Sequence, residues 1–295
     1  MHDAAFYIQL LLSGVTVGSL YALIAIGYTM VYGILRLINF AHGDIFMMAG
    51  FFMVYISASC SLAVSIPLVL LLTVILGVVI ERAAYKPLRT APRMSVMISA
   101  IGVSYLLQNV ALLIWGADTK SFSNVISLPS LKLAGGSIVI TGVTIVTIIG
   151  GILIMAGLML FISKTKTGQA MLAVSEDKGA AQLMGINVNK TISITFAIGS
   201  GLAAIAGVLL CSAYPSLTPY TGAMPGIKAF VAAVFGGIGS IPGAFIGGVV
   251  LGILEIFGKA YISSQMADAI VFGVLIVVLV VKPTGILGKN IQEKV

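Results

Sequence analysis

A few polar side chains interrupt the long apolar stretches of this sequence, and they are the first candidates for chemistry. Tyr105, Gln108 and Asn109 lie close together in one such stretch. Neutral amides can hydrogen-bond a passing ammonium or carboxylate group without trapping it by charge. These residues are candidates to line a transport path, and hydrogen bonding between helices is an alternative that is at least as strong.

No catalytic constellation accompanies these polar residues. The segment Gly285–Asn290 is too short between its glycines for a P-loop, and it ends in Asn. A nucleophile, a base and oxyanion donors do not gather in any one region. Cys60 and Cys211 fall in apolar stretches, outside metal-ligand or CxxC spacing. We expect a protein that is not an enzyme and that uses no cofactor and no metal.

The elements that position these residues must be membrane helices. The chain has 295 residues, of which 59% are hydrophobic and 8% charged, and its mean hydropathy is +1.15. A helical crossing needs roughly 20 apolar residues, and the strict alternation of a β-barrel is absent. We expect an all-α, polytopic helix bundle of about eight or nine helical segments. The charge-free runs are Phe6–Leu35, Ile45–Ile80, Met94–Ala117, Ser137–Ser163, Thr191–Gly226, Ala229–Leu254 and Ala269–Val281.

Basic residues set the expected orientation, because cytoplasmic loops are enriched in Lys and Arg. We expect Lys86, Lys178 and Lys289 to be cytoplasmic, and Lys120 and Lys132 to be outside. Residues 1–295 then form a single membrane domain with a cytoplasmic loop at 164–190. The formal net charge of +7 is explained by this topology and by anionic membrane lipid, with no sign of nucleic-acid binding. The basic residues from which this orientation is predicted are Arg36, Arg82, Lys86, Arg89, Arg93, Lys164, Lys166, Lys178, Lys190, Lys282, Lys289 and Lys294.

A glycine-rich segment should break one of the apolar runs. Gly236, Gly237, Gly239 and Gly243, with Pro242 among them, favour a re-entrant hairpin or two short helices. Broken helices at membrane depth occur only inside protein or beside a cavity. The segment is therefore a candidate for the transport path. A tightly packed loop, in which the glycines only permit close contact, is an equal alternative.

Small residues repeat at helical spacing elsewhere in the chain. Gly239, Gly243 and Gly247 form one stripe, which Gly248 and Gly252 continue on a neighbouring face, and Gly14, Gly18 and Ala22 form a similar stripe. Such stripes let two backbones approach closely in lipid. They indicate a compact bundle, or alternatively a homodimer contact.

The charged stretch Lys164–Lys190 carries the most specific local pattern. Ser175 precedes Glu176 and Asp177, and Gly185 follows the apolar tip of Leu183 and Met184. This order predicts a capped helix from Ser175 to Met184. An amphipathic cytoplasmic helix between two spans suits docking to a partner more than lying on lipid, because its acidic start would face anionic headgroups.

Several motifs in order resemble one known family over essentially the whole chain. They are the stretch 164–190, Asn39-Phe40-Ala41-His42-Gly43-Asp44, Glu81-Arg82-Ala83-Ala84-Tyr85-Lys86-Pro87-Leu88-Arg89, Gly236-Gly237-Ile238-Gly239-Ser240-Ile241-Pro242-Gly243-Ala244, and Lys282-Pro283-Thr284-Gly285-Ile286-Leu287-Gly288. The chain resembles the LivH-type permease of ATP-binding-cassette importers for branched-chain amino acids. Relatives in that family import urea, short amides or other small solutes, so the resemblance is less specific for cargo.

The resemblance implies a function, a cellular location and a set of partner proteins. It implies a multi-pass permease in the inner or plasma membrane of a prokaryote, where it moves Leu, Ile and Val. Its partners would be a LivM-type permease, two cytoplasmic ATPase subunits and an extracytoplasmic amino-acid-binding protein. Residues of the stretch 164–190 would couple it to the ATPase, with the small alanines facing that partner: Ser175, Glu176, Asp177, Ala180, Ala181, Leu183, Met184 and Gly185.

The placement of charge separates this hypothesis from a stand-alone secondary transporter or channel. A carrier coupled to protons or sodium should have carboxylates at mid-membrane, but Asp118, Glu176, Asp177, Asp268 and Glu293 map to loops or ends. An ionisable residue inside a span is a functional candidate by default, which applies to His42 and Asp44. We favour the alternative, in which they lie at the cytoplasmic interface and hold a turn at Gly43, since a cargo driven by ATP needs no proton relay. Glu255 and Lys259, four residues apart, read as an interfacial pair on one helix.

Overall fold

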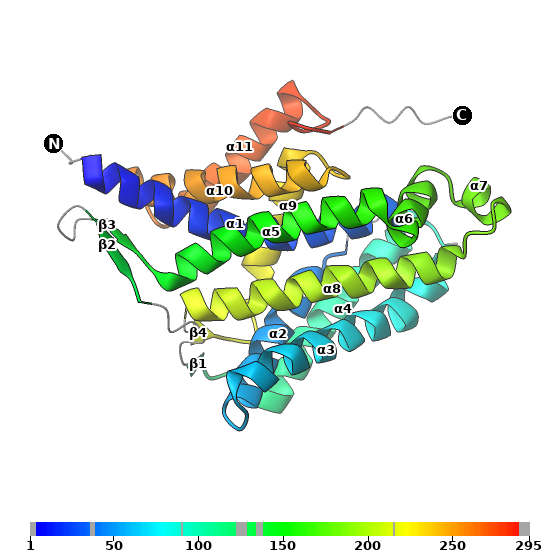
Figure 1. Ribbon diagram of the computed structural model, residues 1–295, viewed down its shortest axis with the longest axis horizontal. Helices are drawn as coiled ribbons and strands as arrows, with labels where there is room; N and C mark the ends of the chain where they lie inside the picture. Colours follow the sequence, from blue (N-terminus) through cyan, green and yellow to red (C-terminus); the bar gives the residue numbers. More distant parts are fainter. Residues whose placement is uncertain are drawn as a thin grey trace. The chain divides into compact units, whose positions relative to one another are not determined.

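The computed structural model describes residues 4–35, 39–89, 91–121, 129–133, 138–214 and 216–288. The expected cytoplasmic residues Arg36, Lys289 and Lys294 therefore lie outside the described residues. Where the chain is described it is almost entirely helical (Figure 1), so the predicted all-α class is confirmed. The helices are α1 Ala4–Leu35, α2 His42–Ser57, α3 Leu62–Ile80, α4 Arg93–Trp115, α5 Gly142–Lys164, α6 Lys166–Glu176, α7 Lys178–Leu183, α8 Val188–Ala213, α9 Ala223–Gly236, α10 Ile241–Tyr261 and α11 Ala267–Val281.

Short irregular elements complete the fold. A π-helical turn, η1 Glu81–Tyr85, and a 3₁₀ turn, η2 Lys86–Leu88, extend α3. Two antiparallel strand pairs lie in the connections between helices. They are β1 Lys120–Ser121 with β4 Ser216–Leu217, and β2 Leu131–Leu133 with β3 Ile138–Ile140.

Helix length and composition make the chain a multi-pass membrane protein. Within the described residues, six helices are long and apolar enough to cross a membrane: Ala4–Leu35, Leu62–Leu88, Met94–Trp115, Gly142–Lys164, Val188–Ala213 and Ile241–Tyr261. Three shorter apolar helices, α2, α9 and α11, accompany them. The long apolar run Ile45–Ile80 divides into α2 and α3, as its length predicts.

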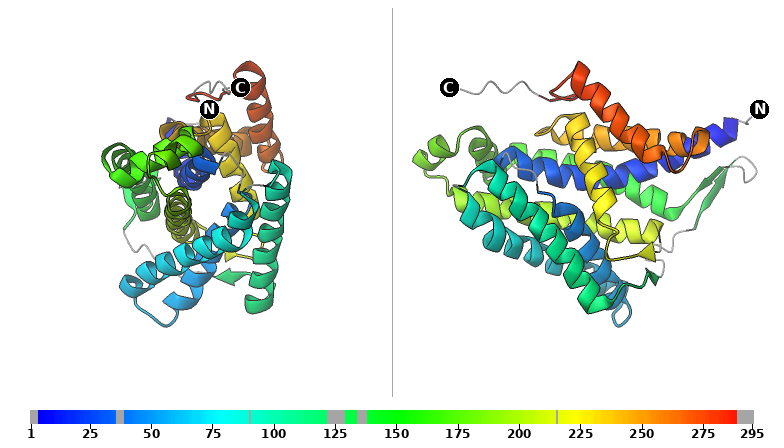
Figure 2. Two further views of the ribbon diagram at one scale, coloured as in Figure 1. Left: turned by 90° about the vertical axis from the view of Figure 1, so that its right-hand side faces the viewer. Right: turned by 180° about the vertical axis from the view of Figure 1, so that it is seen from behind.

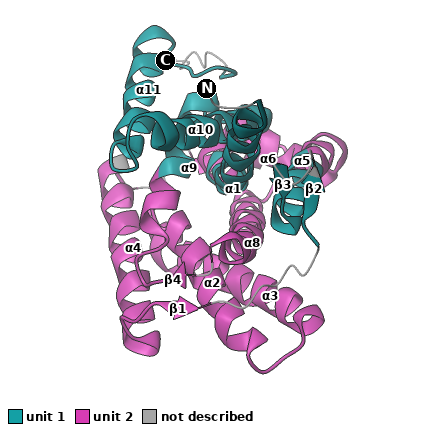
Figure 3. Ribbon diagram, turned by 90° about the vertical axis from the view of Figure 1, so that its left-hand side faces the viewer, with its two compact units in different colours: residues 1–29, 126–155, 228–295 teal, residues 30–125, 156–227 magenta. Residues whose placement is uncertain are grey.

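The chain forms two compact units, which are coloured separately in Figure 3. Unit 2, Met30–Val125 with Ala156–Ile227, is built around α2. This helix contacts α3, α4 and α8. Of its 16 residues, 11 are buried, so α2 is the core of the unit. A Cβ on Gly207 of α8 would lie 2.7 Å from the carbonyl oxygen of Phe46, which shows how closely α8 approaches α2.

Unit 1 comprises Met1–Thr29, Ile126–Met155 and Lys228–Val295. Its helices α1 and α10 meet through the small-residue stripes that the sequence indicates. A Cβ on Gly252 would lie 2.2 Å from the backbone nitrogen of Gly18, and one on Gly248 would lie 2.5 Å from Cα of Ala22. The stripes are therefore used within the chain for close packing of two helices. Helix α11 packs against α10 in the same unit, as Figure 2 shows from behind.

The predicted break at the glycine-rich segment is present in unit 1. Helix α9 ends at Gly236, and α10 begins at Ile241 with Ser240 as its N-cap. Between them Gly237 and Gly239 have φ angles of 108° and 94°, a left-handed conformation that residues with a Cβ rarely adopt. A four-residue turn, residues 237–240, therefore separates the two helices.

Candidate functional site

The charged stretch between α5 and α8 folds into two short helices. The hydroxyl of Thr165 accepts a hydrogen bond from the backbone nitrogen of Gly168 at 3.0 Å and so caps α6. A Cβ on Gly168 would lie 2.4 Å from Cα of Ile162, so α6 folds back tightly on the end of α5. Its apolar residues Met171 and Val174 are buried.

The second helix, α7, starts two residues later than the sequence suggests. The carboxylate of Asp177 accepts from the backbone nitrogen of Ala180 at 2.9 Å and is the N-cap. Ser175 lies in the last turn of α6, where its hydroxyl donates to the carbonyl oxygen of Leu172 at 2.6 Å. The prediction of one helix capped by Ser175 is therefore wrong. Because Met171 and Val174 are buried, α6 continues through Glu176. The backbone at Asp177 is extended and ends α6, and Asp177 then caps the new helix α7.

The end of α7 agrees with the sequence. Gly185 has a φ of 82°, and the backbone nitrogen of Ile186 donates to the carbonyl oxygen of Ala181 at 3.0 Å. This is the usual glycine termination of a helix. A Cβ on Gly185 would meet no atom within 4 Å, so the backbone angle alone explains the glycine.

The exposed surface of α7 is apolar at its tip. Leu183 and Met184 are 90% and 82% exposed, whereas Ala181 is 4% exposed. Ala180 is exposed. The expectation that Ala181 faces a partner is therefore wrong, because its side chain points into the protein. These two large exposed apolar side chains stand together at the end of the helix, and we call them the α7 tip (Leu183 and Met184).

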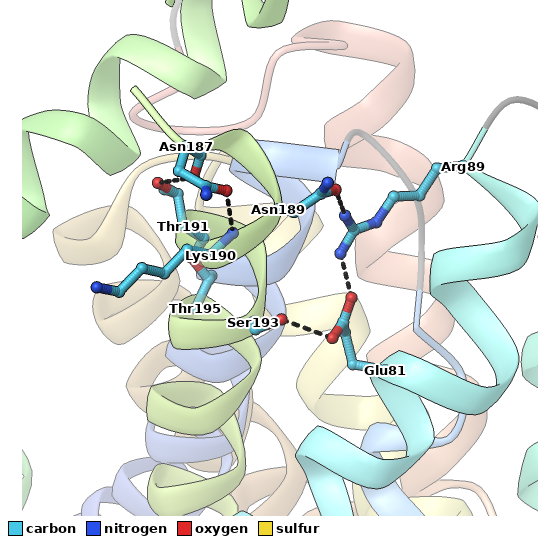
Figure 4. Close-up of polar contacts among 8 residues, drawn as sticks. All are labelled: Glu81, Arg89, Asn187, Asn189, Lys190, Thr191, Ser193 and Thr195. Carbon is cyan, nitrogen blue, oxygen red and sulfur yellow. Dashed lines mark hydrogen bonds and ion pairs between the residues drawn. The ribbon is translucent and has the colours of Figure 1, made fainter. Parts of the chain in front are cut away.

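The start of α8 is held by a polar cluster (Figure 4). Asn187 caps α8 by accepting from the backbone nitrogen of Lys190 at 3.0 Å. Asn189, in the first turn, accepts from the guanidinium of Arg89, which also forms an ion pair with Glu81. Ser193, one turn later, donates to the other carboxylate oxygen of Glu81 at 2.8 Å. We call Glu81, Arg89, Asn189 and Ser193 the Glu81 cluster.

The three polar residues proposed for a path do not converge. The Gln108 side chain is buried and donates to Asp44 at 3.0 Å. Tyr105 is 62% exposed. Asn109 is exposed as well, and its amide donates to the backbone oxygen of Tyr105 in its own helix at 2.8 Å. Gln108 therefore joins helices, whereas Tyr105 and Asn109 lie on the outer face of α4.

Asp44 has a different role from the one expected. It lies within α2 and accepts from Ser104 and Gln108 of α4. The turn precedes it, since the backbone nitrogen of His42 donates to the carbonyl oxygen of Asn39 at 3.1 Å. The prediction that His42 and Asp44 hold a turn at Gly43 is therefore wrong. Periodicity alone could not show that Asp44 faces the polar residues of α4.

The glycine-rich break forms dense backbone contacts in unit 1. A Cβ on Gly236 would lie 1.9 Å from the carbonyl oxygen of Gly243. The later motif near Gly285 joins them, because the backbone nitrogens of Ile286 and Leu287 donate to the carbonyl oxygens of Phe235 and Gly236, both at 2.9 Å. Two motifs far apart in sequence therefore form one joint. Gly239 is the exception, as a Cβ there would meet nothing within 4 Å.

Unit 1 also contains a partly buried ionic cluster that was not predicted from the sequence. Lys228 of α9 pairs with Glu255 of α10 at 2.9 Å and with Asp268 of α11 at 2.6 Å. Lys259 pairs with Glu255 at 2.6 Å, and the Tyr21 hydroxyl of α1 donates to Glu255 at 2.9 Å. We call these five residues the Lys228 cluster. The helical pairing of Glu255 with Lys259 is confirmed, and it joins a buried carboxylate, 2% exposed, to a lysine that is 41% exposed. The sequence feature that could have indicated this cluster is Lys228, a single charged residue between two apolar runs.

Buried carboxylates are thus present in helices as well as loops. The comparison with a secondary transporter, made from the sequence, did not include these three. Each is held by donors within its own unit: Asp44 by two side chains, Glu81 by Arg89 and Ser193, and Glu255 by Tyr21 and two lysines. Glu81 and Glu255 are paired with cations, whereas Asp44 is bonded by neutral donors; these bonds offset the cost of burying a carboxylate. Across the residues that the structure describes, no three His, Cys, Asp or Glu side chains are grouped to hold a metal ion.

Comparison with known proteins identifies the family. The family model described as branched-chain amino acid transport system / permease component matches residues 10–280. The chain is 45% identical to the high-affinity branched-chain amino acid transport system permease protein BraD of Pseudomonas aeruginosa, over 100% of both chains. It is 44% identical to the corresponding protein LivH of Escherichia coli K12, over 98% of each. It is 29% identical to a probable branched-chain amino acid transport permease protein LivH of Methanocaldococcus jannaschii, over 95% of this chain and 92% of that one. Because the match covers nearly every helix described above, the chain belongs to the branched-chain amino acid transport system permease family.

Proposed function

We propose that this chain is the permease subunit that carries Leu, Ile and Val across the inner or plasma membrane of a prokaryote. The observation that carries the proposal is identity of 44–45% over the full length of BraD and LivH. An extracytoplasmic binding protein delivers the amino acid, and separate cytoplasmic ATPase subunits supply the energy. The chain itself has no P-loop for ATP hydrolysis.

The α7 tip supports docking to an ATPase subunit. Leu183 and Met184 are almost fully exposed, and the stretch that carries them lies in the predicted cytoplasmic loop at 164–190. An apolar helix end of this kind fits a groove on a partner protein. The caps at Asp177 and Gly185 fix the direction of α7, and Glu176 and Ala180 lie exposed beside it.

The outer face of α4 supports contact with a LivM-type permease. Tyr105 and Asn109 are exposed on this membrane-spanning helix. Polar side chains in a span generally face protein or a water-filled path and not lipid. We assign this face to the second permease, with the translocation path between the two. We also assign a role in transport to the packed glycine segment between α9 and α10, which includes Gly236, Gly237, Gly239 and Gly243.

We assign residues 1–295 to one membrane domain with nine membrane-embedded segments, namely the six long helices and the three shorter apolar ones. The shorter helices contain 14 to 16 residues, fewer than the roughly 20 of a full crossing. We place α2, with 11 buried residues, inside the protein at membrane depth, where partial crossings are tolerated.

The basic loops give a topology that can be tested by labelling. Cys60 is exposed, so the experiment starts from Cys60→Ser. In intact cells, a membrane-impermeant thiol reagent should label a cysteine at Lys120 or Lys132 and should not label one at Lys178 until the membrane is opened. Labelling at position 178 before permeabilisation would contradict the assignment.

The cargo is tested by uptake into proteoliposomes that contain the complete importer. Labelled leucine should accumulate only with ATP and the binding protein. Unlabelled isoleucine and valine should compete with it, and urea and short amides should not. Competition by urea or an amide alone would point to another cargo. ATP-independent accumulation driven by an ion gradient would contradict the proposed function and favour a secondary transporter.

A further inference from the structure

The segment after α3 departs from regular helix geometry and carries a fully buried charge. Residues Glu81–Tyr85 form a π-helical turn and Lys86–Leu88 a 3₁₀ turn. Glu81 is 0% exposed, and its partner Arg89 is 16% exposed. Such local changes of helix type often mark functional hinges. We call residues 81–89 the hinge segment.

The hinge segment is bonded on one side to the start of α8. Both carboxylate oxygens of Glu81 are used, one by Arg89 and the other by Ser193. Arg89 also bonds Asn189, as Figure 4 shows. Charge-assisted hydrogen bonds of this kind are the strong ones. They fix the hinge segment to the first two turns of α8.

On its other side the hinge segment is bonded to the residue that leads into α2. The hydroxyl of Tyr85, which is buried, donates to the side-chain oxygen of Asn39. The Tyr85 ring also packs against Phe196 of α8, with ring centres 5.4 Å apart. Asn39 opens the turn that is followed directly by α2, the core helix of unit 2.

The start of α8 is in turn closely tied to α7. Helix α7 ends at Leu183 and α8 begins at Val188. Within this short connection, Ile186 bonds back to Ala181 and Asn187 caps α8. Helices α6 and α7 also contact α8 directly. A displacement of α7 must therefore displace the start of α8.

We propose that the hinge segment is a positioning element that passes movement of α6 and α7, through the start of α8, to α2. Glu81 is the residue on which this depends, because it joins Arg89 and Ser193. The inference rests on the proposed function. It gives a role to the motif Glu81–Arg89, which docking to the ATPase does not use.

The test compares Glu81→Gln with the matched control Arg82→Gln in the purified complete importer. Arg82 is exposed on the same π-helical turn. The quantity measured is the number of leucine molecules imported per ATP hydrolysed. Glu81→Gln should keep its ATPase subunits and hydrolyse ATP, but this ratio should fall by about fivefold or more. Arg82→Gln should match the wild type.

A second variant protects the test against misfolding. Tyr85→Phe keeps the ring beside Phe196 and removes only the hydrogen bond to Asn39. Its ratio should fall in the same direction by about twofold to fivefold. The inference would be overturned if both variants imported as many leucine molecules per ATP hydrolysed as the wild type. It would also be overturned if their activity fell only in proportion to the amount of assembled complex. Failure of the wild-type importer to move leucine would instead contradict the proposed function.

Discussion

Replacing Gly237 by alanine should disrupt folding of unit 1 and abolish uptake. Gly237 has a φ of 108°, which alone strains a residue with a Cβ by about 1–3 kcal/mol. The added Cβ would also lie 2.2 Å from the backbone nitrogen of Gly288 and 2.6 Å from its Cα. Backbone atoms held by the hydrogen bonds of residues 286 and 287 cannot move aside as a flexible side chain can.

Gly239→Ala is the matched control. Its φ of 94° is similar, but its Cβ would meet nothing within 4 Å. It should lose only the strain of about 1–3 kcal/mol and remain assembled. The measurement is the fraction of detergent-solubilised protein that stays monodisperse over a temperature series. Equal melting of the two variants would show that the contact with residues 285–288 does not matter. The two positions need glycine for different reasons: Gly243 for close packing, and Gly239 for its positive φ angle.

Replacing Lys228 by methionine should be the most destabilising change among the charged residues. Two carboxylates, Glu255 and Asp268, would lose a shared cation, and Glu255 is 2% exposed. Removing one partner of a buried ion pair typically destabilises by about 3–5 kcal/mol. Glu255 would keep Tyr21 and Lys259, but the balance of two cations and two anions would be lost.

Lys259→Met provides the comparison, because Lys259 also pairs with Glu255 but is 41% exposed. It should destabilise by about 1 kcal/mol or less. The triple variant Lys228→Met, Glu255→Gln, Asp268→Asn removes the charges together and should recover much of the stability. Thermal unfolding of the three proteins in the same detergent checks the order. If Lys259→Met were as severe as Lys228→Met, burial would not be the cause.

The sequence predicted those features that depend on local pattern. Apolar run length gave the helices, as in the division of Ile45–Ile80 into α2 and α3, and Gly237 and Gly239 marked the break. The glycine stripes indicated close packing, because helix periodicity places Gly14 and Gly18 on one face. The apolar tip at Leu183 and Met184 and the glycine termination of α7 were also local, and both are confirmed.

The features that were missed depend on partners distant in sequence. Two residues able to cap a helix, Ser175 and Asp177, stand close together, and only the packing of α6 decides between them. The burial of Glu255 depends on Lys228, 27 positions away, and on Tyr21 of α1. Periodicity gives the face of a helix but not the helix that covers it. For the same reason the sequence could not show that Gln108 bonds Asp44.

In the proposed importer, the α7 tip is the place where the ATPase binds. The direct measurement is cross-linking from a photoreactive thiol probe on Leu183→Cys or Met184→Cys, in the Cys60→Ser background and with the complete importer assembled. Ala181→Cys is the control, because this position is 4% exposed. We expect the probe at 183 or 184 to capture the ATPase subunit and the probe at 181 not to capture it. Assembled, transporting complexes in which neither tip position captures the ATPase would contradict it.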